Sequence, residues 1–254
     1  MIASFIALGL MALMVIIIVG LGLFLRNPEH YKRIALRPID AFNDLPQRAG
    51  ESVENGTRIH ISLGSGTVGT ATTIGALAGI AVLDVVADAA TISDKPPVVT
   101  TGDGASATLA QNALRRAYNH QNAIERYDHL SGRMAGPTPM SYAAGVMLTL
   151  KDENVSTSLL IGTFGNEVGL MADAGRGENA HQIIATDNVQ GQAAAYVTAN
   201  EPLIGEDMYA SGAYLLNGKP FHKASLIAQD VVRLLVIAAL IFGGLLALFG
   251  IDLK

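Results

Sequence analysis

The fold of this chain is decided by residues 58–69, which read RIHISLGSGTVG. Ile59, Ile61 and Leu63 alternate with His60 and Ser62, and this alternation predicts a β-strand. The three glycines that follow allow backbone conformations that other residues avoid, which predicts a tight turn.

A helix is predicted to follow the turn. Apolar residues recur at helical spacing from Ile74 to Ala89, and the first half of this segment is apolar on all sides, which is typical of a buried helix. Gly75 and Gly79 lie four residues apart and favour close packing of backbones. The helix is expected to begin among threonines whose hydroxyls can cap free N–H groups: Thr67, Thr70, Thr72 and Thr73.

The glycine turn matches the G-x-G-x-x-G pattern of dinucleotide-binding domains, in which a pyrophosphate binds at a helix N-terminus. Two observations argue against that interpretation. The pattern requires an acidic residue about 20 residues further on, and the candidate at a strand end, Asp103, comes later. The remaining folded region is also short for a full dinucleotide domain. A plain turn with glycines for packing is the favoured alternative, and no Gly-Lys-Ser/Thr follows to make a P-loop.

Composition excludes several classes of protein. The chain has 254 residues, a net charge of -5 and no cysteine. Nucleic-acid binding has no electrostatic support, and disulfides, thiolate catalysis and Cys-ligated zinc are excluded. His120 and His129 lack the spacing of metal ligands on a helix face, so no metal site is predicted. The sequence identifies no cofactor.

Two long apolar runs predict transmembrane helices. Residues 1–25 are uncharged, as are residues 234–251, and about 20 residues span a bilayer. A cleaved secretory signal is the rival interpretation of the first run, but a positive n-region and a cleavage site are not evident. Residues 64–83 also lack charge, and their many Thr, Ser and Gly residues favour a buried helix over a third span.

Charge next to the runs predicts the topology. Arg26, Lys32, Arg33 and Arg37 follow the first run, Lys219, Lys223 and Arg233 precede the second, and the outer ends carry Lys254 alone. The positive-inside rule therefore places the central domain in the cytoplasm of a two-pass inner (plasma) membrane protein. The predicted divisions are a span at 1–25, a connector at 26–57, an α/β domain at 58–220, a juxtamembrane segment at 221–233 and a span at 234–251.

Small residues repeat every four positions in the second run, at Ala239, Gly243 and Ala247. Such a stripe lets another helix approach closely. The expected partner is the first apolar helix or a neighbouring subunit. Membrane lipid and a homo-oligomer or other membrane proteins are the partners that the sequence suggests.

Further strands are predicted at Val98–Thr101, Tyr142–Leu150, Val155–Phe164 and His181–Ala185, with helices at 105–119, 168–174, 190–199 and 207–216. The second and third of these strands read as a hairpin with a four-residue loop. Strands that alternate with helices indicate an α/β fold with a largely parallel or mixed sheet and flanking helices, bracketed by the two transmembrane helices.

Four of the strands end in a glycine or polar turn, and ligands bind at the carboxyl ends of strands in such sheets. Backbone N–H groups, hydroxyls and carboxylates there suggest a small-ligand or metal–phosphate site. The candidate ligand-binding residues are Gly64, Ser65, Gly66, Thr67, Gly69, Thr101, Asp103, Asn166, Asp187 and Asn188, with Glu167 as a further carboxylate. The favoured alternative is that these polar residues only cap helices. His60 is the histidine nearest the first turn, and a lone strand histidine is more often structural.

The chain resembles an uncharacterised bacterial family of membrane-anchored proteins, a domain-of-unknown-function family. The resemblance rests on Ser93-Asp-Lys-Pro-Pro97, Thr101-Gly-Asp-Gly104, Leu114-Arg-Arg-Ala-Tyr118, Ser141-Tyr-Ala-Ala-Gly145 and Glu201-Pro-Leu-Ile-Gly-Glu206, besides the Gly-Ser-Gly turn. It implies a shared fold and membrane anchoring, and it implies no activity.

Two functions follow from these observations. The first is a non-enzymatic, membrane-anchored α/β scaffold that assembles into a homo-oligomer or joins a membrane complex. The second is a sensory module that binds a nucleotide or another anion at the glycine turn 64–69. No Ser/His/acid or Gly-x-Ser-x-Gly arrangement supports a hydrolase, so an enzyme is the less favoured class.

Overall fold

The computed structural model describes residues 2–34, 36–91, 93–215 and 220–248. The chain forms two compact units. One contains Met1–Arg37 and Asn217–Lys254, and the other contains Pro38–Leu216. The two long terminal helices belong to the first unit, and the whole β-sheet belongs to the second.

The second unit is built on a parallel sheet, which has six strands within the described residues, in the order β3-β2-β1-β4-β5-β6. The strands are β1 Arg58–Gly64, β2 Val98–Thr101, β3 Gly132–Met134, β4 Val155–Thr163, β5 His181–Thr186 and β6 Glu201–Leu203. The order reverses between β1 and β4, which are neighbours in the sheet. This is the order of the doubly wound dinucleotide-binding fold, with its switch point at the β1–β4 pair.

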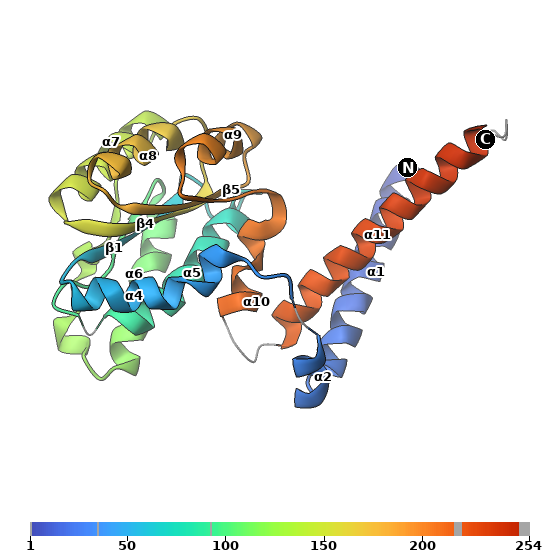
Figure 1. Ribbon diagram of the computed structural model, residues 1–254, viewed down its shortest axis with the longest axis horizontal. Helices are drawn as coiled ribbons and strands as arrows, with labels where there is room; N and C mark the ends of the chain where they lie inside the picture. The colour runs from blue at the N-terminus through green and yellow to red at the C-terminus, as the bar shows by residue number, and fades with distance from the viewer. Residues whose placement is uncertain (1, 35, 92, 216–219, 249–254) are drawn as a thin grey trace. The chain divides into compact units, whose positions relative to one another are not determined.

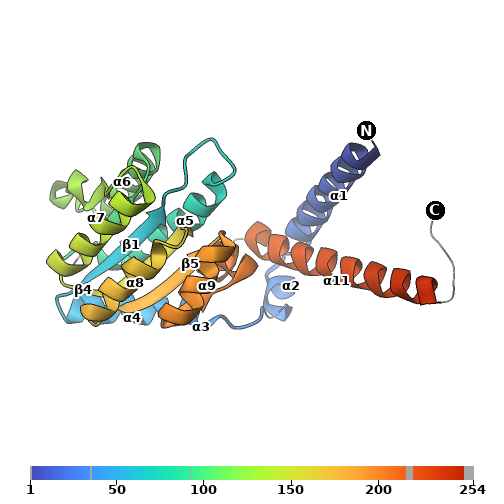
Figure 2. The same ribbon diagram turned by 90° about the horizontal axis from the view of Figure 1, so that it is seen from above.

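Helices cover both faces of the sheet (Figure 1). Helices α5, α6 and α4 lie on one face, and α7, α8 and α9 lie on the other; Figure 2 shows the same layers from above. Their bounds are α3 Asp40–Asn43, α4 Leu45–Glu54, α5 Thr73–Ala90, α6 Gly104–His120, α7 Pro139–Asp152, α8 Val168–Gly177, α9 Val189–Thr198 and α10 Ser211–Leu215, with 3-10 turns at Ile124–Arg126, His129–Ser131 and Gly205–Ala210.

Helix α5 packs against β4 through its two glycines. A Cβ on Gly79 would lie 2.5 Å from the carbonyl oxygen of Ile161, and a Cβ on Gly75 would lie 2.9 Å from the hydroxyl of Thr163. A side chain at Gly79 would push the helix off the sheet, because the atom that it meets is backbone, and a side chain at Gly75 would displace the Thr163 hydroxyl. The predicted close approach is confirmed, and α5 is a buried helix of the α/β unit.

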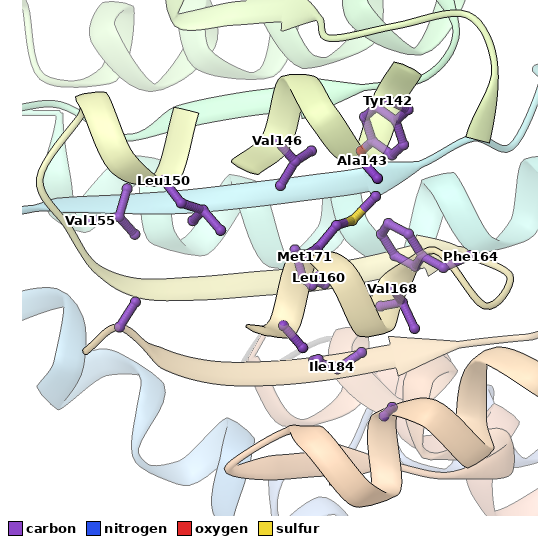
Figure 3. Packing of buried hydrophobic residues seen from close by; sticks show 13 residues of the cluster. Tyr142, Ala143, Val146, Leu150, Val155, Leu160, Phe164, Val168, Met171 and Ile184 are labelled. Atoms are coloured by element: carbon purple, nitrogen blue, oxygen red, sulfur yellow. The ribbon is translucent and has the colours of Figure 1, made fainter. Parts of the chain in front are cut away.

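The core on the opposite face joins α7 and α8 to the sheet. Figure 3 shows Tyr142 and Val146 of α7, Leu160 of β4, Met171 of α8 and Ile184 of β5 meeting side by side. All five side chains are fully buried. Burial of a large apolar side chain contributes about 1.5–3 kcal/mol relative to exposure, so this cluster fixes α7 and α8 over the switch point.

The predicted hairpin is wrong. The segment Tyr142–Leu150 lies inside α7, which begins with a capping box between Thr138 and Ser141. Its buried residues are Tyr142, Ala143, Val146, Thr149 and Leu150, which follow a helical period. Because a helix replaces the expected strand, β4 pairs in parallel on both sides, and the sheet is parallel rather than mixed.

Several short elements were not predicted from the sequence, among them two strands and helix α4. Strands β3 and β6 have three residues each, too few to show alternation. Helix α4 lies within the segment 26–57 that was expected to be a connector, and it buries Leu45 and Ala49. The expectation that the folded region is too short for a dinucleotide domain is also wrong, because the strand order of that fold is complete.

The first unit contains α1 Ile2–Phe24, the short α2 Pro28–Arg33 and α11 Pro220–Leu248. By length and composition, α11 over Pro220–Leu245 and α5 are apolar and long enough to cross a membrane, and the apolar part of α1 measured over Leu8–Phe24 is shorter. Half of α5 is buried in the α/β unit, whereas only 6% of the apolar window of α11 is buried. Lys219, Lys254 and residues 249–251 of the second apolar run lie outside the described residues.

Two positions of the small-residue stripe of α11 have described surroundings, Ala239 and Gly243. Nothing lies within 4 Å of where a Cβ on Gly243 would be, and Ala239 is exposed. The side chain of Ala247 lies outside the described residues. Figure 2 shows α1 and α11 close together beside α2 and diverging away from it.

Candidate functional site

The carboxyl ends of β1 and β4 meet at the switch point. Gly64 pairs with Thr163, and the Ser65 N–H donates to the Thr163 carbonyl oxygen over 2.9 Å. Gly64 has φ +76, and a Cβ there would lie 2.5 Å from the backbone nitrogen and oxygen of Thr163. Glycine is therefore required at this position for two reasons. The backbone is in the left-handed region, and the neighbouring strand leaves no room for a side chain.

The glycine turn is held by its own threonines. The Thr67 N–H donates to the Thr72 hydroxyl over 3.0 Å, and the N–H groups of Gly69 and Thr70 donate to the Thr73 hydroxyl over 2.8 and 3.1 Å. The expectation that these hydroxyls cap the helix is therefore wrong, because they accept from N–H groups of the turn. Thr72, at the N-cap position of α5, makes no side-chain cap to the helix.

Helix α5 therefore begins at the switch point without a side-chain cap. The first N–H groups of a helix have no partner inside the helix, and its N-terminus carries a partial positive charge. Gly75 lies in this first turn and is buried. The arrangement leaves α5 open to an acceptor or an anion at the carboxyl edge of the sheet.

A carboxylate already lies at that place. Asp187, which follows β5, accepts a hydrogen bond from the Thr163 hydroxyl through Oδ2 over 2.9 Å. The same oxygen lies 3.4 Å from where a Cβ on Gly75 would be. Its other oxygen, Oδ1, is buried and has no hydrogen-bond partner among the described residues. Asp187 is thus a half-satisfied acceptor beside the start of α5.

The turn after β2 touches the glycine turn. The Gly102 N–H donates to the Gly64 carbonyl oxygen over 2.9 Å, and the Ser106 hydroxyl donates to the Gly66 carbonyl oxygen over 3.2 Å. Asp103 follows β2 and caps α6 by accepting from the Ser106 N–H over 3.0 Å. The 18-residue α5 accounts for much of the sequence separation that argued against Asp103, and the fold brings this residue to the strand end that the dinucleotide pattern requires.

Other predicted residues are explained by local structure. Asn188 caps α9 by accepting from the N–H groups of Gln190 and Gly191, and the buried Thr101 hydroxyl donates to the Asp103 carbonyl oxygen over 2.9 Å. Asn166 is exposed, and the Glu167 carboxylate accepts from the Gly165 N–H over 2.8 Å. The capping interpretation therefore holds for Asp103 and Asn188, and it does not hold for Asp187.

Tyr209 is a neighbour of the site that sequence reasoning missed. Its ring is 38% exposed, and its pKa is raised first by burial and then by the negative charge of Asp187. It lies in the 3-10 turn after β6, far from the glycine turn along the chain. Only the fold brings this aromatic side chain within the field of Asp187, so no sequence signal could have found it.

A buried polar network lies beneath the site, in the middle of the sheet. His60 is fully buried, with Nδ1 3.0 Å from the Ser158 hydroxyl and Nε2 2.8 Å from the Thr100 hydroxyl. Burial, with a smaller effect of the Arg133 charge, lowers the pKa of His60 to about 3. His60 is therefore neutral at physiological pH and joins three strands, which confirms the structural interpretation.

Tyr142 completes this network from α7. Its hydroxyl hydrogen-bonds to the Ser62 hydroxyl and donates to the Thr100 carbonyl oxygen over 3.2 Å. Burial raises the pKa of Tyr142 to about 12. We refer to His60, Ser62, Thr100, Tyr142 and Ser158 as the central network.

The described residues hold no cluster of three or more His, Cys, Asp or Glu side chains that could bind a metal ion. The described residues of this edge offer hydrogen-bond acceptors, hydroxyls and a helix N-terminus.

The chain belongs to a family described as a domain of unknown function (DUF6754), which it matches over residues 3–254. The resemblance noted from the sequence is thereby confirmed at the level of an uncharacterised family. Comparisons with curated proteins and with solved structures gave no match.

Proposed function

We propose that this protein is a membrane-anchored module that binds a nucleotide at the carboxyl edge of its sheet. One observation supports this above the others: the strand order is that of the doubly wound dinucleotide fold, and the Gly-Ser-Gly turn follows β1 at its switch point. The helices after β1 and β4 leave the sheet on opposite faces, and a crevice opens between such connections.

The residues of the edge suit a nucleotide better than a simple anion. The start of α5 offers N–H groups to phosphate oxygens, while Asp187 presents an unpaired acceptor beside it. A free carboxylate oxygen repels phosphate but accepts from a sugar hydroxyl. A ligand that carries both phosphate and ribose satisfies both groups, with Asp103 and the Tyr209 ring as further contacts.

The membrane anchors in this proposal are α1 and α11. Their apolar lengths and the basic residues that flank them favour a two-pass protein whose α/β unit lies in the cytoplasm. A bound nucleotide would then be sensed at the inner face of the cell membrane.

A second candidate is the non-enzymatic scaffold. Two observations favour it: the threonines close the glycine turn without a ligand, and the face of α11 around Gly243 is open to another helix. In this case the module assembles into a homo-oligomer or a larger membrane complex, and the edge of the sheet is a packing device.

The test is isothermal titration of the full chain in a nonionic detergent with NAD⁺, ADP and inorganic phosphate. We expect a nucleotide to bind and phosphate alone not to bind. The Thr67→Asp variant places a negative charge on an exposed residue of the turn without altering the turn's hydrogen bonds, which use the Thr67 backbone. It should weaken nucleotide binding at least about tenfold through charge repulsion.

Asn112→Asp is the matched control, since it adds the same charge to an exposed position of α6. Its affinity should equal that of the wild type. If neither nucleotide binds, or if Thr67→Asp binds as well as Asn112→Asp, the nucleotide proposal fails. Native mass spectrometry of the same samples then reports whether a closed homo-oligomer supports the scaffold.

A further inference from the structure

The junction of α1, α2 and α11 forms a defined structure of its own. Lys223 of α11 donates from Nζ to the carbonyl oxygen of Tyr31 over 2.7 Å, and the same ammonium lies 4.2 Å from the centre of the Tyr31 ring. Its side chain is almost fully buried. A charge buried in this way holds α2 against α11, because its removal from water is offset only while both contacts persist.

Aromatic contacts fix the same junction from the side of α1. The rings of Phe24 and His30 stack with their centres 4.0 Å apart. The Phe221 ring packs where a side chain on Gly22 would otherwise lie, and the Arg26 guanidinium lies 5.9 Å from the centre of that ring. These contacts hold the turn between α1 and α2 beside the start of α11.

A cavity of about 380 Å³ opens at this junction. The cavity is lined by Leu25, Arg26, Pro28, Tyr31, Lys32 and Pro220. This lining combines apolar side chains with two cations and contains no acidic residue. Arg26 and Lys32 are exposed, and within the described part of the chain neither makes an ion pair. The cavity thus offers an apolar interior with unneutralised positive charge at its mouth.

Along α1, the cavity lies where the apolar run ends. The exposed apolar residues of α1 extend to Leu23 and Phe24. Arg26 and Lys32 follow shortly after them in the sequence. At such a boundary the acyl chains of a lipid end and its phosphate begins. Free phosphate would match the cations but leave the apolar lining uncovered.

We propose that this cavity binds an anionic phospholipid, with its phosphate at Arg26 and Lys32 and its first acyl carbons against Tyr31 and Pro220. The inference rests on the membrane anchoring in the proposed function and is independent of the nucleotide site. Basic pockets at the cytoplasmic ends of transmembrane helices recognise anionic head groups, each cation contributing about a fivefold preference.

The test is native mass spectrometry of the full chain, released from nanodiscs that contain equal amounts of phosphatidylglycerol and phosphatidylcholine. We expect the wild type to retain phosphatidylglycerol preferentially. The double variant Arg26→Gln/Lys32→Gln should lose most of that preference, about fivefold for each cation removed. Millimolar inorganic phosphate should not displace the retained lipid.

The double variant Arg115→Gln/Lys151→Gln is the matched control, because it removes the same charge from exposed sites of the α/β unit. It should retain lipid as the wild type does. Equal retention of the two lipids, an unchanged preference in the Arg26→Gln/Lys32→Gln variant, or displacement by phosphate would each overturn the inference. Alkaline carbonate extraction distinguishes a failure of the lipid inference from a failure of the proposed membrane anchoring. A chain that carbonate releases from the membrane is not an integral membrane protein.

Discussion

The central network and the carboxyl edge use the same kinds of side chain for opposite purposes. In the network, both nitrogens of His60 have partners, as has the Tyr142 hydroxyl, and every member is fully buried. At the edge, one oxygen of Asp187 is paired, and the other is buried with no hydrogen-bond partner in the described part of the chain. Helix α5 begins there without a side-chain cap. A satisfied polar network specifies a fold, whereas a buried acceptor without a protein partner can accept a hydrogen bond from water or a ligand. The central network therefore stabilises the fold, whereas the carboxyl edge keeps polar groups available for binding.

The largest effect is expected from breaking the network at its centre. His60→Ala removes the imidazole partner of each of two buried hydroxyls, those of Ser158 and Thr100, and leaves a cavity. The two effects together should cost about 3–5 kcal/mol of unfolding free energy. Chemical denaturation of the full chain in detergent, followed by tyrosine circular dichroism, measures it. His129→Ala, on a side chain that is 76% exposed, should cost less than about 0.5 kcal/mol. Similar losses in both variants would show that the network is not special.

The pH dependence of stability should carry the signature of His60. Its pKa is about 3 in the folded chain against 6.5 in the unfolded chain, so the unfolded state binds a proton first. The stability due to neutral His60 is fully present above pH 6.5 and is lost as the pH falls toward 3, by about 1.4 kcal/mol per pH unit.

By pH 4 this loss reaches about 3 kcal/mol. The same denaturation series is then repeated on His60→Gln, whose side chain does not titrate. Between pH 6 and 4, its unfolding free energy should depend less steeply on pH than that of the wild type, by the slope that corresponds to about one proton. Parallel curves for the two chains would contradict the burial of a neutral imidazole.

A smaller loss is expected where the network reaches α7. Tyr142→Phe keeps the ring, which stacks near Phe164, but leaves the Ser62 hydroxyl without this partner. The expected cost is about 1–2 kcal/mol, the penalty of one buried unsatisfied group. Tyr196→Phe, on a ring that is 73% exposed, provides the matched control and should be neutral. If Tyr142→Phe leaves the unfolding free energy unchanged, the hydroxyl of Tyr142 does not contribute to the stability of the network.

The edge should respond in the opposite sense. Asp187→Ala should weaken nucleotide binding about tenfold, the contribution of a hydrogen bond to a charged group, while unfolding free energy changes by less than about 1 kcal/mol. Titration calorimetry and denaturation of the same sample give both values. Asp173→Ala, on an exposed acid of α8, should change neither. A large loss of stability with unchanged affinity would assign Asp187 to structure.

Local patterns predicted the parts of this fold that are locally encoded. Alternation located β1, and β2, β4 and β5 lie at or within a residue of their predicted bounds. The same local rules failed where they were ambiguous. The apolar segment from Tyr142 to Leu150 suits a strand or a buried helix, and the capping box at Thr138 decided for the helix.

The candidate site divides along the same line. The glycine turn, Asp103 and Asn188 were recognised from the sequence because each lies at the end of a strand next to the start of a helix. The contact between Thr163 and Asp187 and the neighbourhood of Tyr209 were not recognisable, because they join residues from different strands and turns.

The sequence by itself determined the alternation of strands and helices, the glycine turn after β1 and the two long apolar helices, since each follows from the side chains of neighbouring residues. Only the tertiary structure decided that β4 lies beside β1 and that Asp187 lies at the start of α5. Parallel strands are connected by helices that cross over one face of the sheet. The order of the strands therefore depends on which face of the sheet each helix packs against. That choice is made by the whole core at once.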